Sequence, residues 1–227
     1  MEHALWPSDA VHADVTLESK GANGEGLDMQ MKLVRDQRAA NVRTQLRIVE
    51  PPGATGSVYE ITSQPGKPLD REMYISALRR IRDVSGIRRT DAFMGSEFSY
   101  EDLDIAAPRD SEWKHVERVE QDGRPLVRVT SAPYSQYERV EVLLDPKTAL
   151  PVSVSFYDRD GSLYKLETFS GLETVDGHEL PTRIEMQDVQ NGAKSVLRLH
   201  GIRLRDAVDE KVFSESPLRT APVGAKP

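Results

Sequence analysis

Hydrophobic and polar residues alternate along much of this 227-residue chain, so that apolar side chains recur at every second position. Residues 13–18 and 27–33 both show this period. Residues 41–48 show it most clearly, because Leu46 and Ile48 fall on one side of the segment while arginine and glutamine residues fall on the other. A period of two is typical of a strand with one buried face. The amino-terminal part of the chain is therefore expected to form strands.

Beyond residue 112 the pattern predicts a meander, because short alternating runs are separated by turn residues rather than by helical stretches. The Asp176-Gly177 and Asn191-Gly192 pairs mark two of these turns, which need positive φ angles. Consecutive hairpins of this kind form an antiparallel sheet with one buried face and one wet face. We therefore predict a mainly β protein. The expected strands are 113–120, 124–130, 137–144, 151–157, 162–169, 180–189 and 193–204.

Three segments do not follow the meander. Residues 72–84 fit either an arginine-rich amphipathic helix or a pair of strands, since their apolar positions satisfy neither period well. Residues 91–105 mix aromatic and acidic side chains around Gly95 and suit a short helix or an ordered loop. Residues 208–213 are expected to form a short helix, with acidic residues near its start. No linker composition is visible, so we expect one domain over residues 1–219, followed by a flexible tail at 220–227.

Composition removes several function classes. The net charge is −7, and 30% of the residues are charged, with no apolar run near the ~20 residues that a membrane-spanning helix needs. The acidic balance argues against nucleic acid as a partner. The absence of cysteine excludes disulfides and thiolate sites but leaves the cellular compartment open. The first seven residues have neither the basic nor the apolar region of a secretory signal.

No catalytic constellation is visible, and we expect no catalytic residue, metal or cofactor. Residues 94–97 lack the second glycine of a nucleophile elbow, and residues 158–161 resemble a calcium loop without its final acidic ligand. No glycine-rich phosphate-binding motif follows a strand. Spacing alone cannot distinguish a catalytic carboxylate pair from a solvated strand face. The histidines are scattered without metal-ligand spacing, at His3, His12, His115, His178 and His200.

Two groups of side chains are candidates for binding. A basic group inside this acidic chain can form a patch for an anionic headgroup or a partner, or it can be a solvated edge that prevents sheet-to-sheet aggregation. It consists of Arg79, Arg80, Arg82, Arg88 and Arg89. The second group contains flexible and aromatic apolar side chains, which either hold an acyl chain or pack in an ordinary core. It consists of Met29, Met31, Phe93, Met94, Phe98, Phe156 and Met186.

Residues 91–103, DAFMGSEFSYEDL, resemble the signature of the LolA-like outer membrane lipoprotein-sorting protein family, approximately S-F-M-G-S-D-F-S/T-Y-E-D-L. Arg79-Arg80-Ile81-Arg82 stands where that family has a basic run, and the resemblance extends from about residue 27 to residue 219. Residues 73–78 depart from the family because they lack its tryptophan and proline. Further segments follow in family order at 142–151, 156–165, 177–188 and 212–218.

This resemblance implies a strongly curved antiparallel sheet, an incomplete and half-open β-barrel of the LolA/LolB kind, with a few short helices covering its concave face. It implies a periplasmic protein whose signal peptide has been removed, no enzymatic activity, and a cavity for lipid or lipoprotein acyl chains. An RND-type exporter is the implied membrane partner. Residues 93–100 are then expected to act as a lid, because Gly95 permits a tight bend.

On this interpretation the cavity is formed by converging strand faces together with the lid. The alternative is a periplasmic accessory protein that carries no ligand and docks onto a membrane transporter through the arginine patch. An unrecognised lipid hydrolase is a third interpretation, which the lack of a convergent catalytic group disfavours. The residues predicted to line the cavity and lid are Met29, Met31, Leu46, Ile48, Phe93, Met94, Phe98, Tyr100, Val154, Phe156, Ile184 and Met186.

Overall fold

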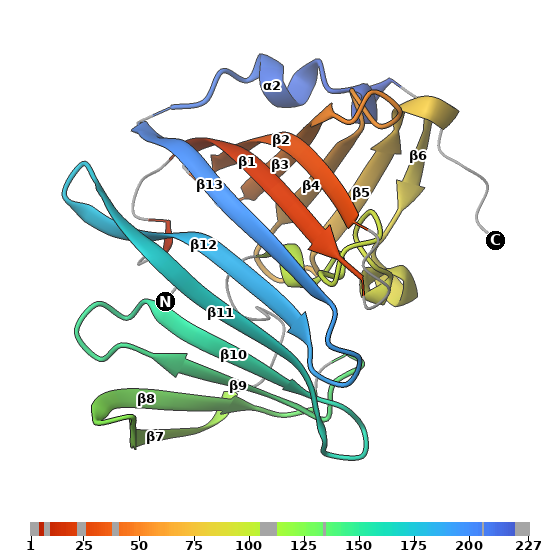
Figure 1. The fold of residues 1–227 in the computed structure, drawn as a ribbon. Coiled ribbons are helices and arrows are strands. Elements are labelled where there is room, and N and C mark those ends of the chain that lie inside the picture. The colour runs from red at the N-terminus through yellow and green to blue at the C-terminus, as the bar shows by residue number, and fades with distance from the viewer. Residues whose placement is uncertain are drawn as a thin grey trace. The chain divides into compact units, whose positions relative to one another are not determined.

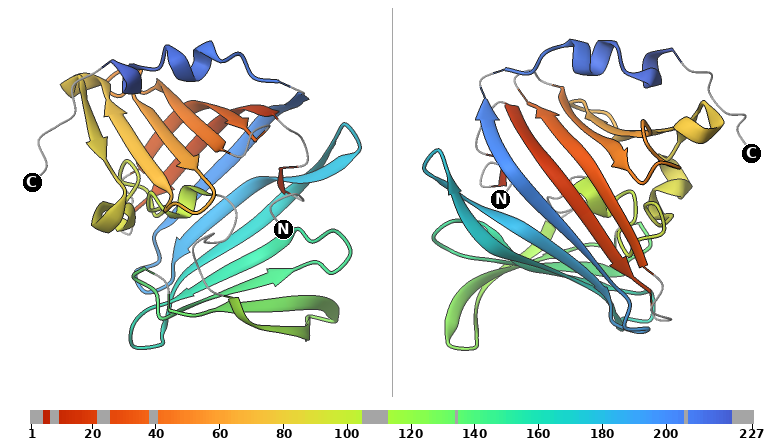
Figure 2. Two further views of the ribbon diagram at one scale, coloured as in Figure 1. Left: turned by 180° about the vertical axis from the view of Figure 1, so that it is seen from behind. Right: turned by 45° about the horizontal axis from the view of Figure 1, so that its top comes forward.

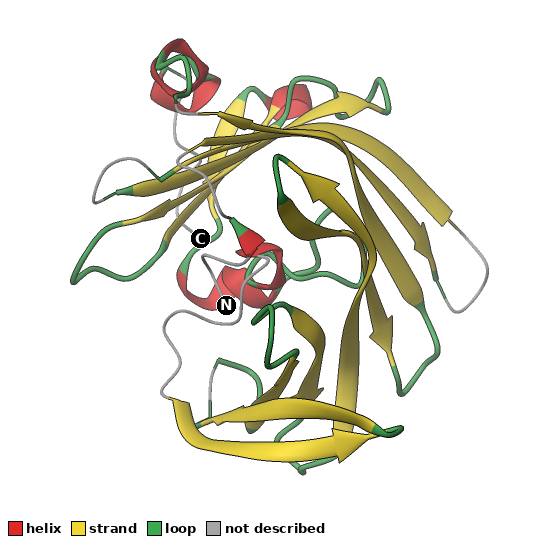
Figure 3. Cartoon of the chain, turned by 90° about the vertical axis from the view of Figure 1, so that its left-hand side faces the viewer, coloured by secondary structure: helices red, strands yellow, loops and turns green. Residues whose placement is uncertain are grey.

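A computed structural model describes residues 5–6, 10–21, 26–37, 41–104, 113–133, 135–205 and 207–220 (Figure 1). Residue His3 and residues 221–227, nearly all of the predicted flexible tail, lie outside the described residues. Strands dominate the chain and the helices are short (Figure 3). Within the described ranges, no helix is both long enough and apolar enough to span a membrane.

Thirteen strands of the described residues form one antiparallel sheet in the order β6-β5-β4-β3-β2-β1-β13-β12-β11-β10-β9-β8-β7. Within these residues β6 and β7 are the two edge strands, so the sheet is not closed. The prediction of a mainly β, antiparallel fold is confirmed. The strong curvature that the resemblance implies stays a prediction. The strands are β1 (Ala10–Lys20), β2 (Gly26–Asp36), β3 (Val42–Glu50), β4 (Val58–Ser63), β5 (Asp70–Ile75), β6 (Arg80–Asp83), β7 (Trp113–Gln121), β8 (Arg124–Ser131), β9 (Arg139–Leu144), β10 (Pro151–Tyr157), β11 (Leu163–Val175), β12 (His178–Asp188) and β13 (Lys194–Arg205).

The segments that the pattern left open take simple forms. The strand-pair alternative for residues 72–84 is confirmed, because β5 and β6 pair with Ile75 opposite Arg80 and are joined by η1 (Ser76–Leu78). Arg79 makes this turn with a φ of 49°. The other helical elements are η2 (Gly86–Thr90), η3 (Asp102–Asp104), α2 (Lys211–Ser214) and η4 (Pro217–Arg219). The helix expected at 208–213 is therefore present but begins later.

Contacts divide the chain into two compact units, each built from several stretches of sequence. Unit 1 comprises residues 1–7, 18–27 and 92–198, and unit 2 comprises residues 8–17, 28–91 and 199–227. Strands β1 and β13 each contribute to both units. The single domain expected from the sequence stays a prediction.

In unit 2, one face of β2–β5 carries a continuous apolar row, which we call the methionine face. Met31 pairs with Ile48, and Leu33 pairs with Leu46, which in turn faces Tyr59 on β4. Tyr59 in turn pairs with Met73 on β5. These side chains are buried. Paired residues of neighbouring strands point to the same side of a sheet, so Met31, Leu46 and Ile48 share one face of this unit. The convergence of all the predicted strand faces on one cavity stays a prediction.

The opposite face of the same strands is covered by the C-terminal segment, residues 207–220, which runs across them with α2 (Figure 2). Phe213 and Val208 pack with Ala10 in one buried cluster, and Leu218 packs with Val58 and Ile81 in another. Two separate apolar anchors therefore fix this short segment on the sheet, although its helices are too short to be stable by themselves.

Candidate functional site

In unit 1, one face of β9–β12 is buried, and we call it the Lys165 face. Val154 on β10 and Met186 on β12 both pair with Glu167 on β11, and Phe156 pairs with Lys165. All five residues are at most 6% exposed. Ile184 lies two residues before Met186 on β12 and is also buried. The predicted residues Val154, Phe156, Ile184 and Met186 therefore do share one face.

Residues 92–104, the lid segment, are fastened to this face by polar contacts. The Nζ of Lys165 donates to the carbonyl oxygen of Glu97 at 2.7 Å and lies 3.3 Å from Oδ2 of Asp102. The backbone N–H of Glu97 donates to Oγ of Ser195 on β13 at 2.9 Å. Ser195 in turn shares a 2.6 Å hydrogen bond with the hydroxyl of Ser19. The backbone of Glu97 is thus held from both sides by side chains of the sheet.

The aromatic side chains of the lid segment are buried. Phe93 and Tyr100 meet edge to face with ring centroids 5.6 Å apart, and Phe98 is 1% exposed. The N–H of Phe93 donates to the carbonyl oxygen of Phe98 at 2.7 Å, which closes the bend. Met94 and Gly95 form that bend with φ angles of 52° and 82°. Met94 is only half-buried, and it is the one predicted lid residue with a partly open side chain.

A buried polar cluster lies where the lid segment meets the Lys165 face. Asp102 accepts from the N–H of Ser99 at 2.8 Å, from the hydroxyl of Tyr137 at 3.4 Å and from Lys165. Burial alone would lower the pKa of Lys165, but the charge and hydrogen bond of Asp102, together with Tyr164 and Glu97, outweigh it and leave that pKa raised. Burial, with Asp102 next, raises the pKa of Tyr137 well above its usual value. Lys165 and Asp102 therefore form the charged centre of the cluster.

Glu167 differs from its neighbours because it is a buried carboxyl group between apolar side chains. Its Oε1 atom has no hydrogen-bond partner among the residues that the structure describes. Burial raises the pKa of Glu167 well above its usual value, Asp102 raises it further, and Lys165 opposes the shift. The neutral acid is therefore favoured, which places a hydrogen-bond donor between Val154 and Met186.

The predicted cavity residues divide between the two units. Eleven of the twelve, all except Met94, are at most 5% exposed. Four of them lie in unit 2 on the methionine face, and the other eight lie in unit 1. The four in unit 2 are Met29, Met31, Leu46 and Ile48. Within each unit the strand residues share a face as expected, and their role in binding a ligand stays a prediction.

The predicted arginine patch lies in unit 2: Arg79 directly precedes β6, Arg80 and Arg82 lie on it, and Arg88 and Arg89 lie in η2. Arg79 and Arg80 are exposed, whereas Arg82, Arg88 and Arg89 are partly buried. The guanidinium of Arg82 forms a 3.1 Å ion pair with Asp91. Part of the patch is therefore already neutralised inside the protein, and a partner would meet chiefly its exposed end.

Sequence reasoning missed the polar members of the site. Lys165, Glu167 and Ser195 were not predicted, because a charged or hydroxyl residue on a strand is normally assigned to the wet face. The signal was present in the alternation, since Lys165 and Glu167 fall on the same side of β11 as Phe169. Among the described residues, no group of three or more histidine or acidic side chains is placed to hold a metal ion.

Comparisons with known proteins identify the family. A family model described as "Uncharacterized protein" matches residues 40–220. A domain assigned as an outer membrane lipoprotein-sorting protein, from Vibrio parahaemolyticus, is 25% identical, with a TM-score of 0.82 over 92% of this chain and 91% of that one. The chain belongs to the family that this model describes, and its fold is LolA-like. No curated protein shows a significant sequence match to this LolA-like chain.

Two further solved structures share the LolA-like fold. A DUF1329 family protein from Desulfovibrio piger is 19% identical, with a TM-score of 0.83 and 92% of each chain covered. A LolA superfamily protein from Nitrosomonas europaea is also 19% identical, with a TM-score of 0.70 and 93% of each chain covered. None of these three names denotes an enzyme. This LolA-like chain is thus similar to one lipoprotein-sorting domain and to two proteins that share its fold.

Proposed function

We propose that this LolA-like protein is a periplasmic carrier that binds lipid or lipoprotein acyl chains and is not an enzyme. The observation that carries the proposal is the lid segment, whose aromatic side chains are buried and whose backbone is fastened to an apolar strand face by Lys165 and Ser195. Releasing a few polar contacts would free this segment. An acyl chain placed against the exposed apolar face gains about 0.8 kcal/mol per buried methylene.

The apolar faces suit such a cargo. Met186 lies on the Lys165 face, and Met29, Met31 and Met73 lie on the methionine face. Methionine side chains are flexible and polarisable, so they adapt to chains of irregular shape. Transfer to or from the outer membrane together with an RND-type exporter belongs to the same proposal, and the exposed Arg79 and Arg80 are its candidate contact with that partner or with anionic headgroups.

The burial of eleven predicted cavity residues also favours a second candidate, an accessory protein that carries no ligand. In that case the apolar faces form a closed core, and the protein acts by docking onto a membrane transporter through the arginine patch. Binding of that kind would weaken as salt increases.

The test is native mass spectrometry of protein purified from a Gram-negative periplasm without detergent, followed by organic extraction of bound lipid. We expect a stoichiometric lipid or acylated peptide in the wild type and its loss in Met94→Asp. Met94 is half-buried, so this variant should fold. The matched control is Val116→Asp, which changes a side chain that is 66% exposed on β7.

One result would overturn the carrier, and another would remove its lid. The first is a clean ligand-free mass for the wild type under conditions that preserve a known lipid complex, which would support the docking protein instead. The second is unchanged lipid recovery in a folded Met94→Asp variant, which would remove the lid segment from the mechanism. Retained binding of a transporter in Arg79→Glu/Arg80→Glu would separately remove the patch from partner recognition.

A further inference from the structure

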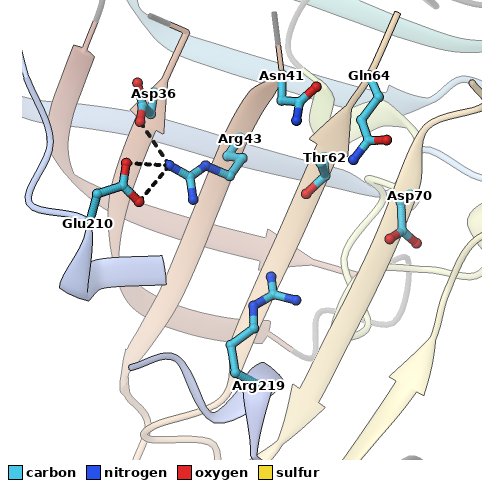
Figure 4. A pocket seen from close by; sticks show the side chains of 8 residues that line it. All are labelled: Asp36, Asn41, Arg43, Thr62, Gln64, Asp70, Glu210 and Arg219. Atoms are coloured by element: carbon cyan, nitrogen blue, oxygen red, sulfur yellow. Dashed lines mark hydrogen bonds and ion pairs between the residues drawn. The ribbon is translucent and has the colours of Figure 1, made fainter. Parts of the chain in front are cut away.

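Unit 2 contains a polar pocket of about 490 Å³ on the face of β2–β5 opposite the methionine face (Figure 4). A row of paired residues crosses four strands beneath it. Asp36 pairs with Arg43, Arg43 with Thr62, and Thr62 with Asp70. The volume lies in the range of small-molecule sites. Because it lies on the other side of the strands, this pocket is distinct from the apolar site proposed for acyl chains.

The C-terminal segment supplies the opposite wall of the pocket. Glu210 precedes α2, and Arg219 lies in η4, from which its guanidinium reaches toward the strands (Figure 4). Phe213 and Leu218 pack into separate apolar clusters of the same unit and fix this wall in place. The pocket is therefore formed from two elements far apart in the sequence, both held by buried side chains.

The two arginines of the pocket are already compensated by carboxylates. Arg43 bonds Asp36 at 3.1 Å and Glu210 at 2.9 Å, and its guanidinium carbon lies 4.1 Å from the centre of the Phe213 ring. Arg219 bonds the buried carboxylate of Glu60. These contacts hold both guanidinium groups in fixed orientations and leave the pocket without a surplus of positive charge.

Four other lining side chains have no polar partner within the described part of the chain. They are the amides of Asn41 and Gln64, the hydroxyl of Thr62 and the carboxylate of Asp70. Figure 4 shows Thr62 on β4, Gln64 just after that strand and Asp70 on the neighbouring strand β5, at one side of the pocket. Together they offer both donors and acceptors over a short distance. Their hydrogen-bonding capacity is thus available to a ligand.

The composition of the lining narrows the ligand class. An acyl chain is disfavoured because the lining side chains are polar or charged. An anion is disfavoured because it would approach the uncompensated Asp70 and the carboxylates that hold Arg43. A simple ammonium group would use Asp70 but would leave the two amides and the hydroxyl unpaired.

We propose that this pocket binds a sugar residue. Each sugar hydroxyl both donates and accepts, so neighbouring hydroxyls can satisfy the carboxylate of Asp70 and the amides of Asn41 and Gln64 together. The compensated guanidinium groups of Arg43 and Arg219 add fixed donors without attracting a charged ligand. The proposal concerns unit 2 alone and does not depend on acyl-chain binding by the other face.

The test is a nuclear magnetic resonance titration of the full ¹⁵N-labelled chain with glucose, galactose and N-acetylglucosamine, each up to the high millimolar range. We expect at least one of these sugars to shift the amides of Thr62, Asp70 and Glu210 in a saturable manner. Asp70→Ala and Gln64→Ala should each weaken that binding about tenfold. The matched control is Lys67→Ala. Lys67 is exposed in the turn between β4 and β5, and its side chain does not line the pocket.

Parallel titrations with inorganic phosphate and with ethanolamine distinguish the other ligand classes. Saturable shifts at the same amides with phosphate or ethanolamine, but with none of the three sugars, would overturn the sugar assignment. The absence of saturable shifts with every probe would overturn the site itself. Equal loss of sugar binding in Lys67→Ala and Asp70→Ala, with both variants folded, would show that the pocket residues are not the ones recognising the sugar.

Discussion

The ammonium group of Lys165 lies 3.3 Å from the carboxylate of Asp102, and both side chains are almost fully buried, at 7% and 2% exposed. This pair joins strand β11 to the lid segment. Charged groups at such depth are costly unless they remain paired. The lid segment is therefore held by an interaction that is strong when intact and strongly unfavourable when one partner is lost.

Lys165→Met should destabilise the protein by about 3–5 kcal/mol, because it leaves Asp102 as an uncompensated buried charge. The double variant Lys165→Met/Asp102→Leu should be more stable than the single one, since it removes both charges together. Urea unfolding of the wild type, both single variants and the double variant would measure the coupling.

The control for this cycle is the Lys32–Asp14 pair in unit 2. Its nitrogen and oxygen are closer, at 2.7 Å, but its side chains are 63% and 52% exposed. Lys32→Met should therefore change stability by about 0–1 kcal/mol. If Lys165→Met lost as little stability as Lys32→Met, the buried pair would not hold the lid segment as proposed.

Glu167→Gln should change the pH dependence of stability. The folded-state pKa of Glu167 is raised above its unfolded value of about 4.5, so the folded protein keeps a proton that the unfolded chain loses as pH rises. This group therefore makes the wild type less stable with rising pH above that value, by about 1.4 kcal/mol per pH unit until the folded pKa is passed. Glutamine is neutral throughout and should remove that slope.

Urea unfolding at about pH 4, 6 and 8 would test this prediction. The free energies of unfolding of wild type and Glu167→Gln should differ least at the most acidic pH. At the most alkaline pH the variant should be the more stable protein. Glu185 provides a control of opposite sign, because the hydrogen bonds and charges of Arg183 and Lys194 together outweigh its burial and leave its pKa lowered. Glu185→Gln should lose stability at neutral pH, and the loss should fade as pH falls. Parallel curves for wild type and Glu167→Gln would contradict a raised pKa.

Gly171 in β11 should tolerate alanine less well than Gly177 in the turn that follows. Both have positive φ angles, 67° and 83°, so either substitution should cost about 1–2 kcal/mol from backbone strain. At Gly171 a Cβ would also lie 2.8 Å from Oγ1 of Thr182, whereas at Gly177 it would meet open space.

Thermal or urea unfolding of Gly171→Ala and Gly177→Ala would separate the two effects, with an additional loss of about 1–3 kcal/mol expected only at Gly171. Thr182→Ala should relieve part of that additional loss in the double variant. Equal destabilisation at both glycines would show that the strand adjusts around the new methyl group.

The sequence anticipated most of the sheet because alternation and glycine turns are local signals. Strand β4 (Val58–Ser63) was missed, although Val58, Tyr59 and Ile61 are β-formers, because both of its faces contain buried residues and the alternation is weak. Strand β11 continues six residues past its expected end at Phe169. In this extension Leu172 is 58% exposed, so apolar and polar residues do not separate into a buried face and a wet face. Local periodicity cannot report pairing that occurs outside a core.

The candidate sites were less accessible to sequence reasoning than the fold. Apolar positions such as Met186 could be placed on a buried face by their period, but the pairing of Lys165 with Asp102 joins residues 63 positions apart. The polar pocket brings together Arg43 and Arg219, which are still farther apart along the chain. Contacts of this kind follow from topology, which a single sequence does not specify.

Ser195→Ala should loosen the lid segment without a comparable effect elsewhere. The hydroxyl of Ser195 accepts the N–H of Glu97, and its removal leaves that donor unpaired at a cost of about 1–3 kcal/mol. Hydrogen exchange followed by mass spectrometry should show faster exchange in a peptide covering residues 93–104. Ser57→Ala is the control, because the Ser57 hydroxyl accepts the N–H of Ser76 in unit 2. It should accelerate exchange near Ser76 and leave residues 93–104 unchanged. Equal acceleration of the lid segment by both variants would mean that it opens only with global unfolding, which would contradict a lid that moves by itself.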